Sequence, residues 1–163
     1  MRFLVRLLPL VVLFAVVIFD LNPAAAQKRK LPYFASIAAS KARMRTGPGR
    51  NYPASWLYQR ADLPIKVVDI YKEWRKVEDP DGTQGWMQAN LLSEHRTAIV
   101  TGTAVDLLAA PNFDSEIEWR AAPGVVGRVS KCSRTWCWFD VRGRAGFVEK
   151  SRIWGVAAEE TFS

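Results

Sequence analysis

Two cysteines and one histidine are the side chains in this 163-residue chain that most often serve catalysis or tight metal binding. Cys132 and Cys137 lie close together, whereas His95 is far from both in the sequence. A closed zinc site needs four ligands, so these three residues cannot form one. A single histidine also leaves few ways to build a triad with a histidine base. No glycine-rich phosphate loop is present, and no metal or other cofactor is expected.

The spacing of the two cysteines favours a disulfide. Cys132 ends one expected strand and Cys137 begins the next, with four residues between them. Cysteines that face each other across a hairpin come within bonding reach, and such bonds persist in oxidising compartments. The alternative is a redox-active pair, but its usual spacing is Cys-x-x-Cys at the start of a helix. We therefore expect a structural Cys132–Cys137 bond.

Positively charged and aromatic side chains give the other candidates for chemistry. The ligand-binding candidates are Arg43, Arg45, Arg50, Tyr52 and Trp56. Guanidinium groups pair with carboxylates through two parallel hydrogen bonds, so this group is suited to an acidic ligand. The alternative is that the arginines form an ordinary solvated face of a strand.

An internal repeat sets the elements that position these residues. Residues 42–92 align with residues 105–153 if two single-residue gaps are allowed. Matched pairs include Pro48 with Pro111, Trp56 with Trp119, Trp74 with Trp136, and Gly85-Trp86 with Gly146-Phe147. The chain therefore contains two copies of one module of about 60 residues. We call residues 33–93 copy one and residues 97–156 copy two.

The hydrophobic pattern within each copy has the period of strands. Ala42 and Met44 alternate with charged residues, and Ile65–Ile70 is a largely β-branched run. No stretch has the length and the 3.6-residue period of a helix. About five short strands without helices cannot cover both faces of an open sheet. We predict an all-β fold of two tandem small barrels, each closing on itself and ending in a helical turn.

Comparison of the two copies separates core positions from free ones. Aromatic residues at shared strand positions are expected to fill the cores, namely Trp74, Trp86, Trp136 and Phe147. Trp56 recurs as Trp119, which favours a core role for Trp56 over stacking on a ligand. Arg43 and Arg45 correspond to Asp106 and Leu108, so the fold does not require their charge. A position that the fold leaves free is the better ligand candidate.

Copy one resembles a bacterial Src-homology-3-like (SH3) domain. The resemblance rests on Arg43-Met44-Arg45-Thr46-Gly47-Pro48, Trp74-Arg75-Lys76-Val77 and Gly85-Trp86-Met87. Copy two is more divergent but keeps Trp136 and Gly146-Phe147-Val148. The resemblance implies a small barrel with a targeting or binding role, often towards cell-wall peptidoglycan or partner proteins. The papain-like peptidase that often accompanies such barrels is not expected, because no histidine lies near either cysteine.

The first 26 residues have the layout of a secretory signal peptide. Arg2 and Arg6 precede the apolar run Leu7–Phe19, and Ala24–Ala26 supplies small residues before Gln27. An uncleaved anchor is the alternative, but the run is shorter than the roughly 20 apolar residues of a spanning helix. We expect cleavage before Gln27. The protein is then periplasmic or secreted, with no stable membrane span.

The expected function is that of an exported, non-catalytic binding module that contacts peptidoglycan or a cell-envelope partner. A formal net charge of +7 favours anionic polymers or membranes over nucleic acid in an exported protein. The alternatives are an accessory protein that binds peptides or proteins without wall affinity and, least of all, an enzyme with an unrecognised site. The expected division is 1–26 signal peptide, 27–32 mobile N-terminal segment, 33–93 and 97–156 SH3-like domains, and 157–163 C-terminal tail.

Overall fold

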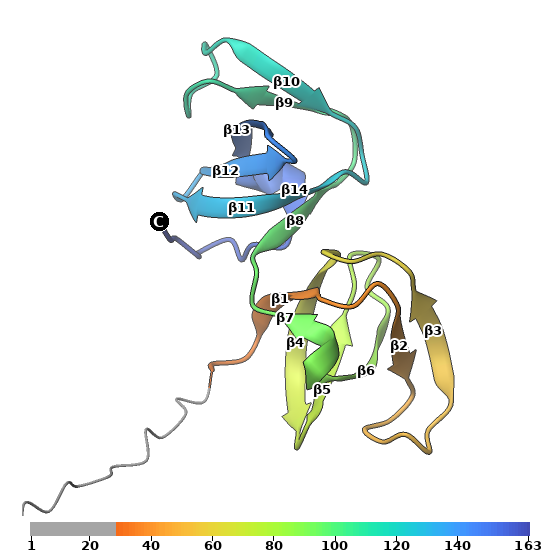
Figure 1. Ribbon diagram of the computed structural model, residues 1–163. Coiled ribbons are helices and arrows are strands. Elements are labelled where there is room, and N and C mark those ends of the chain that lie inside the picture. Colours follow the sequence, from red (N-terminus) through yellow and green to blue (C-terminus); the bar gives the residue numbers. More distant parts are fainter. Residues whose placement is uncertain (1–28) are drawn as a thin grey trace, which may run out of the picture.

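A computed structural model describes residues 29–163, so the expected signal peptide and its cleavage site before Gln27 lie outside the described residues. The chain forms two sheets of seven strands (Figure 1). Copy one contains β1 (Tyr33–Ile37), β2 (Ala42–Arg45), β3 (Ala54–Tyr58), β4 (Pro64–Tyr71), β5 (Trp74–Glu78), β6 (Gln84–Gln88) and β7 (Leu92–Ser93). Copy two contains β8 (Thr97–Val100), β9 (Val105–Leu108), β10 (Ile117–Ala121), β11 (Val126–Cys132), β12 (Trp136–Val141), β13 (Arg144–Glu149) and β14 (Ile153–Trp154).

The two sheets have the same topology. Their strand orders are β3-β2-β6-β5-β4-β1-β7 and β10-β9-β13-β12-β11-β8-β14. A 3-10 turn precedes the last strand of each copy, η1 (Ala89–Leu91) and η2 (Lys150–Arg152). The repeat in the sequence is therefore a repeat in the structure, and the expected all-β fold of two tandem barrels is confirmed.

Each copy differs from the expected barrel in two respects. It has seven strands rather than about five, because β1 precedes the aligned part of the repeat and β7 has only two residues. The barrel is also expected to close on itself, but within residues 29–163 the edge strands β3 and β7 do not pair with each other. Each sheet curls around its core and leaves one seam open.

The side chains of the strands alternate between core and surface. In β2, Ala42 and Met44 are buried, whereas Arg43 is exposed. The core of copy one consists of Ala35, Ile37, Ala42, Met44, Ile65, Val67, Val77 and Met87. The core of copy two consists of Ala98, Val100, Val105, Leu107, Ala121, Val129, Cys132, Cys137, Phe139, Val148, Ile153 and Val156. Each copy thus has a hydrophobic core of its own.

The two copies pack against each other beside the short segment that joins β7 to β8 (Figure 1). Phe34 of β1 contacts Trp154 of β14 with ring centroids 5.0 Å apart. Arg60, in the loop between β3 and β4, donates a hydrogen bond from Nη2 to the carbonyl oxygen of Gly124 at 2.9 Å. The junction is therefore held by side chains of both copies as well as by the linker.

Candidate functional site

Two pockets lie at equivalent places in the two copies. The pocket of copy one has a volume of about 390 Å³ and that of copy two about 280 Å³. Buried tryptophans, Trp74 and Trp136, line the pockets at matching positions of β5 and β12. The other matching lining positions are Lys41 and Ala104, Arg43 and Asp106, Arg45 and Leu108, Gln88 and Glu149, and Leu91 and Arg152. The same fold therefore presents two different chemical surfaces.

The pocket of copy one is positively charged. Alternation along β2 turns Arg43 and Arg45 away from the core, and Lys41 precedes them on the same face. Arg45 Nη1 donates a hydrogen bond to the carbonyl oxygen of Tyr52 at 2.7 Å, which fixes its guanidinium. Within the described part of the chain, none of these three cations forms an ion pair, and no carboxylate lines the pocket. The pocket can therefore accept an anionic group.

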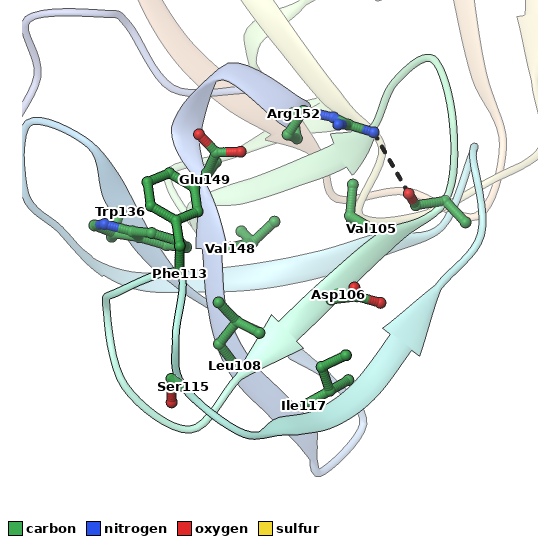
Figure 2. A pocket seen from close by; sticks show the side chains of 11 residues that line it. Val105, Asp106, Leu108, Phe113, Ser115, Ile117, Trp136, Val148, Glu149 and Arg152 are labelled. Carbon is green, nitrogen blue, oxygen red and sulfur yellow. Dashed lines mark hydrogen bonds between the residues drawn. The ribbon is translucent and has the colours of Figure 1, made fainter.

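The pocket of copy two is lined by apolar side chains and by charged side chains of both signs (Figure 2). The ring of Phe113 tilts against Trp136 with centroids 5.0 Å apart, although 71% of Phe113 is exposed. Asp106 accepts a hydrogen bond at 2.6 Å from Nε of Arg120, which raises the pKa of that guanidinium above its ordinary value. Arg152 Nη2 donates to Thr103 Oγ1 at 2.5 Å. Two carboxylates, Asp106 and Glu149, thus accompany the one cation of this pocket, whereas the pocket of copy one has cations alone.

The structure brings together only part of the predicted ligand-binding group. Arg43 and Arg45 line the pocket, but Arg50, Tyr52 and Trp56 do not. Tyr52 instead covers the backbone of the preceding loop, because a Cβ added to Gly47 would lie within 2.7 Å of the Tyr52 ring. Tyr52 therefore packs on the loop beside the pocket.

The favoured core role of Trp56 is wrong. Trp56 is 57% exposed, and its counterpart Trp119 is 45% exposed. Both lie on edge strands, β3 and β10, in each of which the first four residues are exposed. An aromatic residue that recurs in both copies is thus a feature of the shared surface at these positions, and not of the core.

Two of the four predicted core aromatics are also misplaced. Trp74 and Trp136 are buried, although they line the pockets beside the two core clusters, whereas Trp86 and Phe147 are only half-buried. In the sequence Gly85-Trp86-Met87, the glycine and the methionine face inward and the tryptophan faces outward. This inward position has no room for a side chain, because a Cβ added to Gly85 would lie 2.5 Å from Cγ of Met44.

Sequence reasoning did not name several pocket residues. Leu57 pairs with Arg43 across β2 and β3, and Gln88 pairs with Trp74 across β5 and β6. Lys41 could have been found from the alternation of charged and apolar residues that continues into β2. Leu57 and Gln88 could not, because only the strand register places them beside Arg43 and Trp74.

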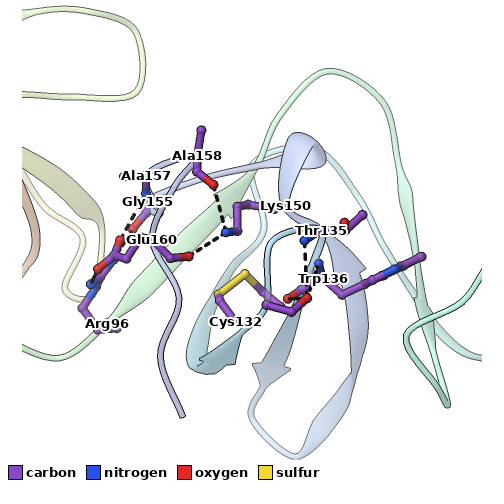
Figure 3. The surroundings of a disulfide bond; sticks show 11 residues. Arg96, Cys132, Thr135, Trp136, Lys150, Gly155, Ala157, Ala158 and Glu160 are labelled. Atoms are coloured by element: carbon purple, nitrogen blue, oxygen red, sulfur yellow. Dashed lines mark hydrogen bonds and ion pairs between the residues drawn. A yellow bond between two sulfur atoms is a disulfide. The ribbon is translucent and has the colours of Figure 1, made fainter.

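The predicted Cys132–Cys137 disulfide is present in the structure (Figure 3). The two cysteines are directly opposite each other in the register of β11 and β12. Both belong to the core of copy two, so the bond fastens the hairpin from the inside. No free cysteine remains in the described residues, which leaves neither thiol for nucleophilic chemistry there.

The expected C-terminal tail packs against copy two (Figure 3). Cys132 and Phe162 form a bridge in which each backbone N–H donates to the other's carbonyl oxygen, at 2.8 and 3.1 Å. The buried Lys150 ammonium donates to the carbonyl oxygens of Ala158 and Glu160 at 3.1 and 2.6 Å. Arg96 binds the Glu160 carboxylate with both terminal nitrogens and holds the pKa of that carboxyl below its ordinary value. These contacts tie the end of the chain to the domain.

The described residues contain no group of three His, Cys, Asp or Glu side chains that could hold a metal ion. His95 lies exposed in the segment between the copies, where its backbone N–H donates to Ser93 Oγ at 3.1 Å. From residue 29 onward, the chain forms no helix of the length and apolar character needed to cross a membrane.

Solved structures with similarity to this chain include NlpC2 and NlpC1 from Trichomonas vaginalis and an NlpC/P60 family protein from Bacillus cereus. The sequence identities are 10%, 10% and 14%, and the TM-scores are 0.34, 0.33 and 0.34. The alignments cover 77%, 79% and 74% of this chain but only 49%, 48% and 55% of those proteins. The chain thus spans about half the length of these proteins. No curated protein matches it.

The bacterial SH3 domain family matches the sequence twice, at residues 38–94 and at residues 101–155. Each match covers most of one seven-stranded sheet. The chain therefore belongs to the bacterial SH3 domain family and contains two tandem domains of that family.

Proposed function

We propose that the protein is an exported, non-catalytic binding module whose first SH3 domain recognises carboxylate groups of peptidoglycan stem peptides. The observation that carries this proposal is the pocket of copy one. It places Lys41, Arg43 and Arg45 around Trp74 with no carboxylate in its lining. Membership of the bacterial SH3 domain family supports a binding role.

The chemistry of the pocket suits a small acidic group attached to a larger ligand. A guanidinium binds a carboxylate with two parallel hydrogen bonds, and such charge-assisted bonds are about twice as strong as neutral ones. Arg45 is already oriented by the Tyr52 carbonyl, so less side-chain entropy is lost when a ligand binds. The buried indole of Trp74 and the exposed Leu57 supply an apolar surface beside the charges. Stem peptides combine carboxylates with short apolar side chains, which fits this surface.

The test is binding of the purified protein to insoluble cell-wall sacculi. The double variant Lys41→Gln/Arg43→Gln removes two pocket cations that make no described hydrogen bond or ion pair. Lys30→Gln/Arg134→Gln is its matched control, because it removes one lysine and one arginine that are exposed and lie outside the pocket. We expect the pocket variant to bind at least about tenfold more weakly and the control to bind like the parent.

The salt dependence of binding gives a second measurement in the same experiment. Binding of the parent should weaken as the salt concentration rises, and this dependence should be smaller in the pocket variant. Equal binding by the parent and the pocket variant would contradict the proposal. If sacculi do not retain the parent, the remaining candidate is an accessory protein that binds a peptide or protein segment. The exposed aromatic side chain of Phe113 beside Trp136 in the pocket of copy two favours that candidate over an enzyme.

A further inference from the structure

The junction between the two copies contains a cleft lined by arginines from both. The cleft has a volume of about 600 Å³, and its charged lining residues are Arg60 from copy one and Arg142 and Arg144 from copy two. An adjoining pocket of about 520 Å³ shares Arg60 and Arg142 and adds Arg128. Neither space overlaps the pocket proposed above to bind carboxylates.

Arg60 is held in the cleft by a single contact. Its Nη2 donates to the carbonyl oxygen of Gly124 at 2.9 Å, across the junction. A guanidinium has five N–H donors, so this bond positions the group and leaves most of its donors available. The contact also ties the shape of the cleft to the way in which the two copies pack.

Arg142 and Arg144 lie on either side of Gly143 in the turn between β12 and β13. Arg142 has φ = 54°, in the left-handed region that favours Gly, Asn or Asp over a long side chain. The equivalent turn of copy one is Asp81-Gly82-Thr83, in which Gly82 has a positive φ like its counterpart Gly143, whereas Asp81 does not share the positive φ of Arg142. The turn therefore does not require arginine at either position. Arg144 is further oriented by stacking on the ring of Trp119, 5.4 Å from the centroid.

The arginines of the cleft form no ion pair with the carboxylates nearest to them in the described residues. No acidic residue lines the space that Arg60, Arg142 and Arg144 share. The adjoining pocket contains Asp62 and Asp140, and Asp140 Oδ1 already accepts the backbone N–H of Gly143 at 2.6 Å. Across residues 29–163, none of the four arginines of the two spaces takes part in an ion pair. Three like charges thus line one concave space that has no carboxylate in its own lining.

We infer that this interdomain cleft binds a phosphate group. Three guanidinium groups that approach from two domains can each bond a different oxygen of a tetrahedral anion. A carboxylate offers only two oxygens in one plane and cannot use all three in this way. The group could belong to free phosphate, to a phosphomonoester or to a phosphodiester polymer, and the charge of the group distinguishes these sources. Because both copies contribute arginines, the bound phosphate would bridge the two SH3 domains.

The test is an NMR titration of the ¹⁵N-labelled protein with inorganic phosphate, dimethyl phosphate and acetate. Saturable shifts of the amides around Arg60, Gly124 and Arg142 should appear with inorganic phosphate and be at least about tenfold weaker with acetate. Dimethyl phosphate binding as tightly as phosphate identifies a diester ligand, and weaker binding identifies a monoester or free phosphate. The inference is overturned if acetate binds as tightly as phosphate or if no shift saturates.

Two matched variants separate this site from general attraction to a basic protein. Arg142→Asn/Arg144→Gln removes two cleft charges, and asparagine tolerates the left-handed backbone at its position. Arg50→Gln/Arg134→Gln removes two exposed arginines outside both spaces. The cleft variant should lose at least about tenfold in phosphate affinity while its melting temperature stays near that of the parent. Equal losses in both variants would overturn the inference. Lys41→Gln/Arg43→Gln should bind phosphate like the parent, so failure of the proposed function would leave this result unchanged.

Discussion

The indole of Trp154 in copy two meets the ring of Phe34 in copy one edge to face, with centroids 5.0 Å apart and planes at 88°. Phe34 lies on β1 and Trp154 on β14, and both rings are half-buried. Edge-to-face aromatic pairs are directional, so this contact restricts the angle between the two copies as well as their distance. Together with the bond from Arg60 to Gly124, it places the arginines of both copies around one cleft.

Replacement of Phe34 by alanine should loosen this junction. The aromatic pair contributes about 0.5–1.5 kcal/mol beyond the area that it buries, so the copies should lose their fixed arrangement before either unfolds. We expect ¹⁵N relaxation to give a shorter rotational correlation time for both copies in the variant than in the parent. Phe113→Ala is the control, because Phe113 contacts Trp136 within copy two. A correlation time in the Phe34 variant equal to that of the parent would show that other contacts suffice.

The sequence predicts the arrangement of strands better than it predicts which way each side chain points. The repeat and its strand pattern lead directly to two barrels with equivalent topology. Trp86 and Phe147 are misplaced because the rule that large aromatic residues fill cores competes with the two-residue alternation of strands. Gly146 faces inward, since a Cβ there would lie 2.8 Å from Cβ of Leu107, and this turns Phe147 outward. A glycine at the crossing of two strands is thus the better signal for the inward face.

The sequence also predicts the residues of the candidate sites only in part. Arg43 and Arg45 could be chosen from the sequence, because copy two has no positive charge at the equivalent positions. Arg50, Tyr52 and Trp56 are close to them in sequence, but the loop and the edge strand carry these side chains away from the pocket. The interdomain cleft could not be predicted, because the packing of the two copies brings Arg60 near Arg142. No local pattern encodes that packing.

Tyr58 should make copy one sensitive to alkaline pH. Its hydroxyl donates to Oδ2 of the buried Asp79 at 2.7 Å, and the other oxygen of Asp79 accepts the N–H groups of Asp81 and Thr83. Burial, and then the hydrogen bond to Asp79, raise the pKa of Tyr58 above its ordinary value of about 10. The folded state therefore holds this proton more tightly than the unfolded state. The resulting stability is fully present below about pH 10 and is lost as the pH rises towards the raised pKa.

Tyr58→Phe tests this relationship. The variant should lose about 1 kcal/mol of stability at neutral pH, because the hydrogen bond to Asp79 is missing. Its free energy of unfolding should fall less steeply than that of the parent above about pH 10. Denaturant unfolding across the alkaline range measures both effects. Tyr71→Phe is the control, since Tyr71 is exposed and its hydroxyl makes no hydrogen bond within the described residues. An alkaline slope equal to that of the parent would contradict the role of Tyr58.

The Cys132–Cys137 bond should stabilise copy two alone. It closes a short loop, so its removal is expected to cost about 2 kcal/mol. Cys132 also shares a backbone bridge with Phe162, and the loss should therefore extend to the C-terminal residues. In Cys132→Ala/Cys137→Ala, amide hydrogen exchange should accelerate in β11, β12 and the chain end. Amides of copy one serve as the internal control, and an equal acceleration there would contradict two separate cores.

Replacement of pocket residues in copy one by their counterparts from copy two gives the sharpest test of where binding occurs. Arg43→Asp/Arg45→Leu gives copy one the residues that copy two carries at the equivalent positions, Asp106 and Leu108. Since β9 accommodates those residues in the same sheet position, the fold should persist. The loss of the bond from Arg45 to the Tyr52 carbonyl should cost only about 1 kcal/mol.

Binding to sacculi should nevertheless fall by more than about tenfold in this variant, because the pocket loses two cations and gains a carboxylate. Arg134→Asp/Arg50→Leu is the matched control, with the same chemical changes at exposed positions outside the pocket. The melting temperature reports any loss of folding, and binding at low and high salt reports the loss of the pocket charges. Comparison of the two measurements separates unfolding from weaker recognition. If the control loses as much binding as the exchange variant, net charge governs binding and the pocket has no special role. If the exchange variant unfolds, Arg43 and Arg45 are structural, and their replacement in copy two depends on compensation such as the ion pair between Asp106 and Arg120.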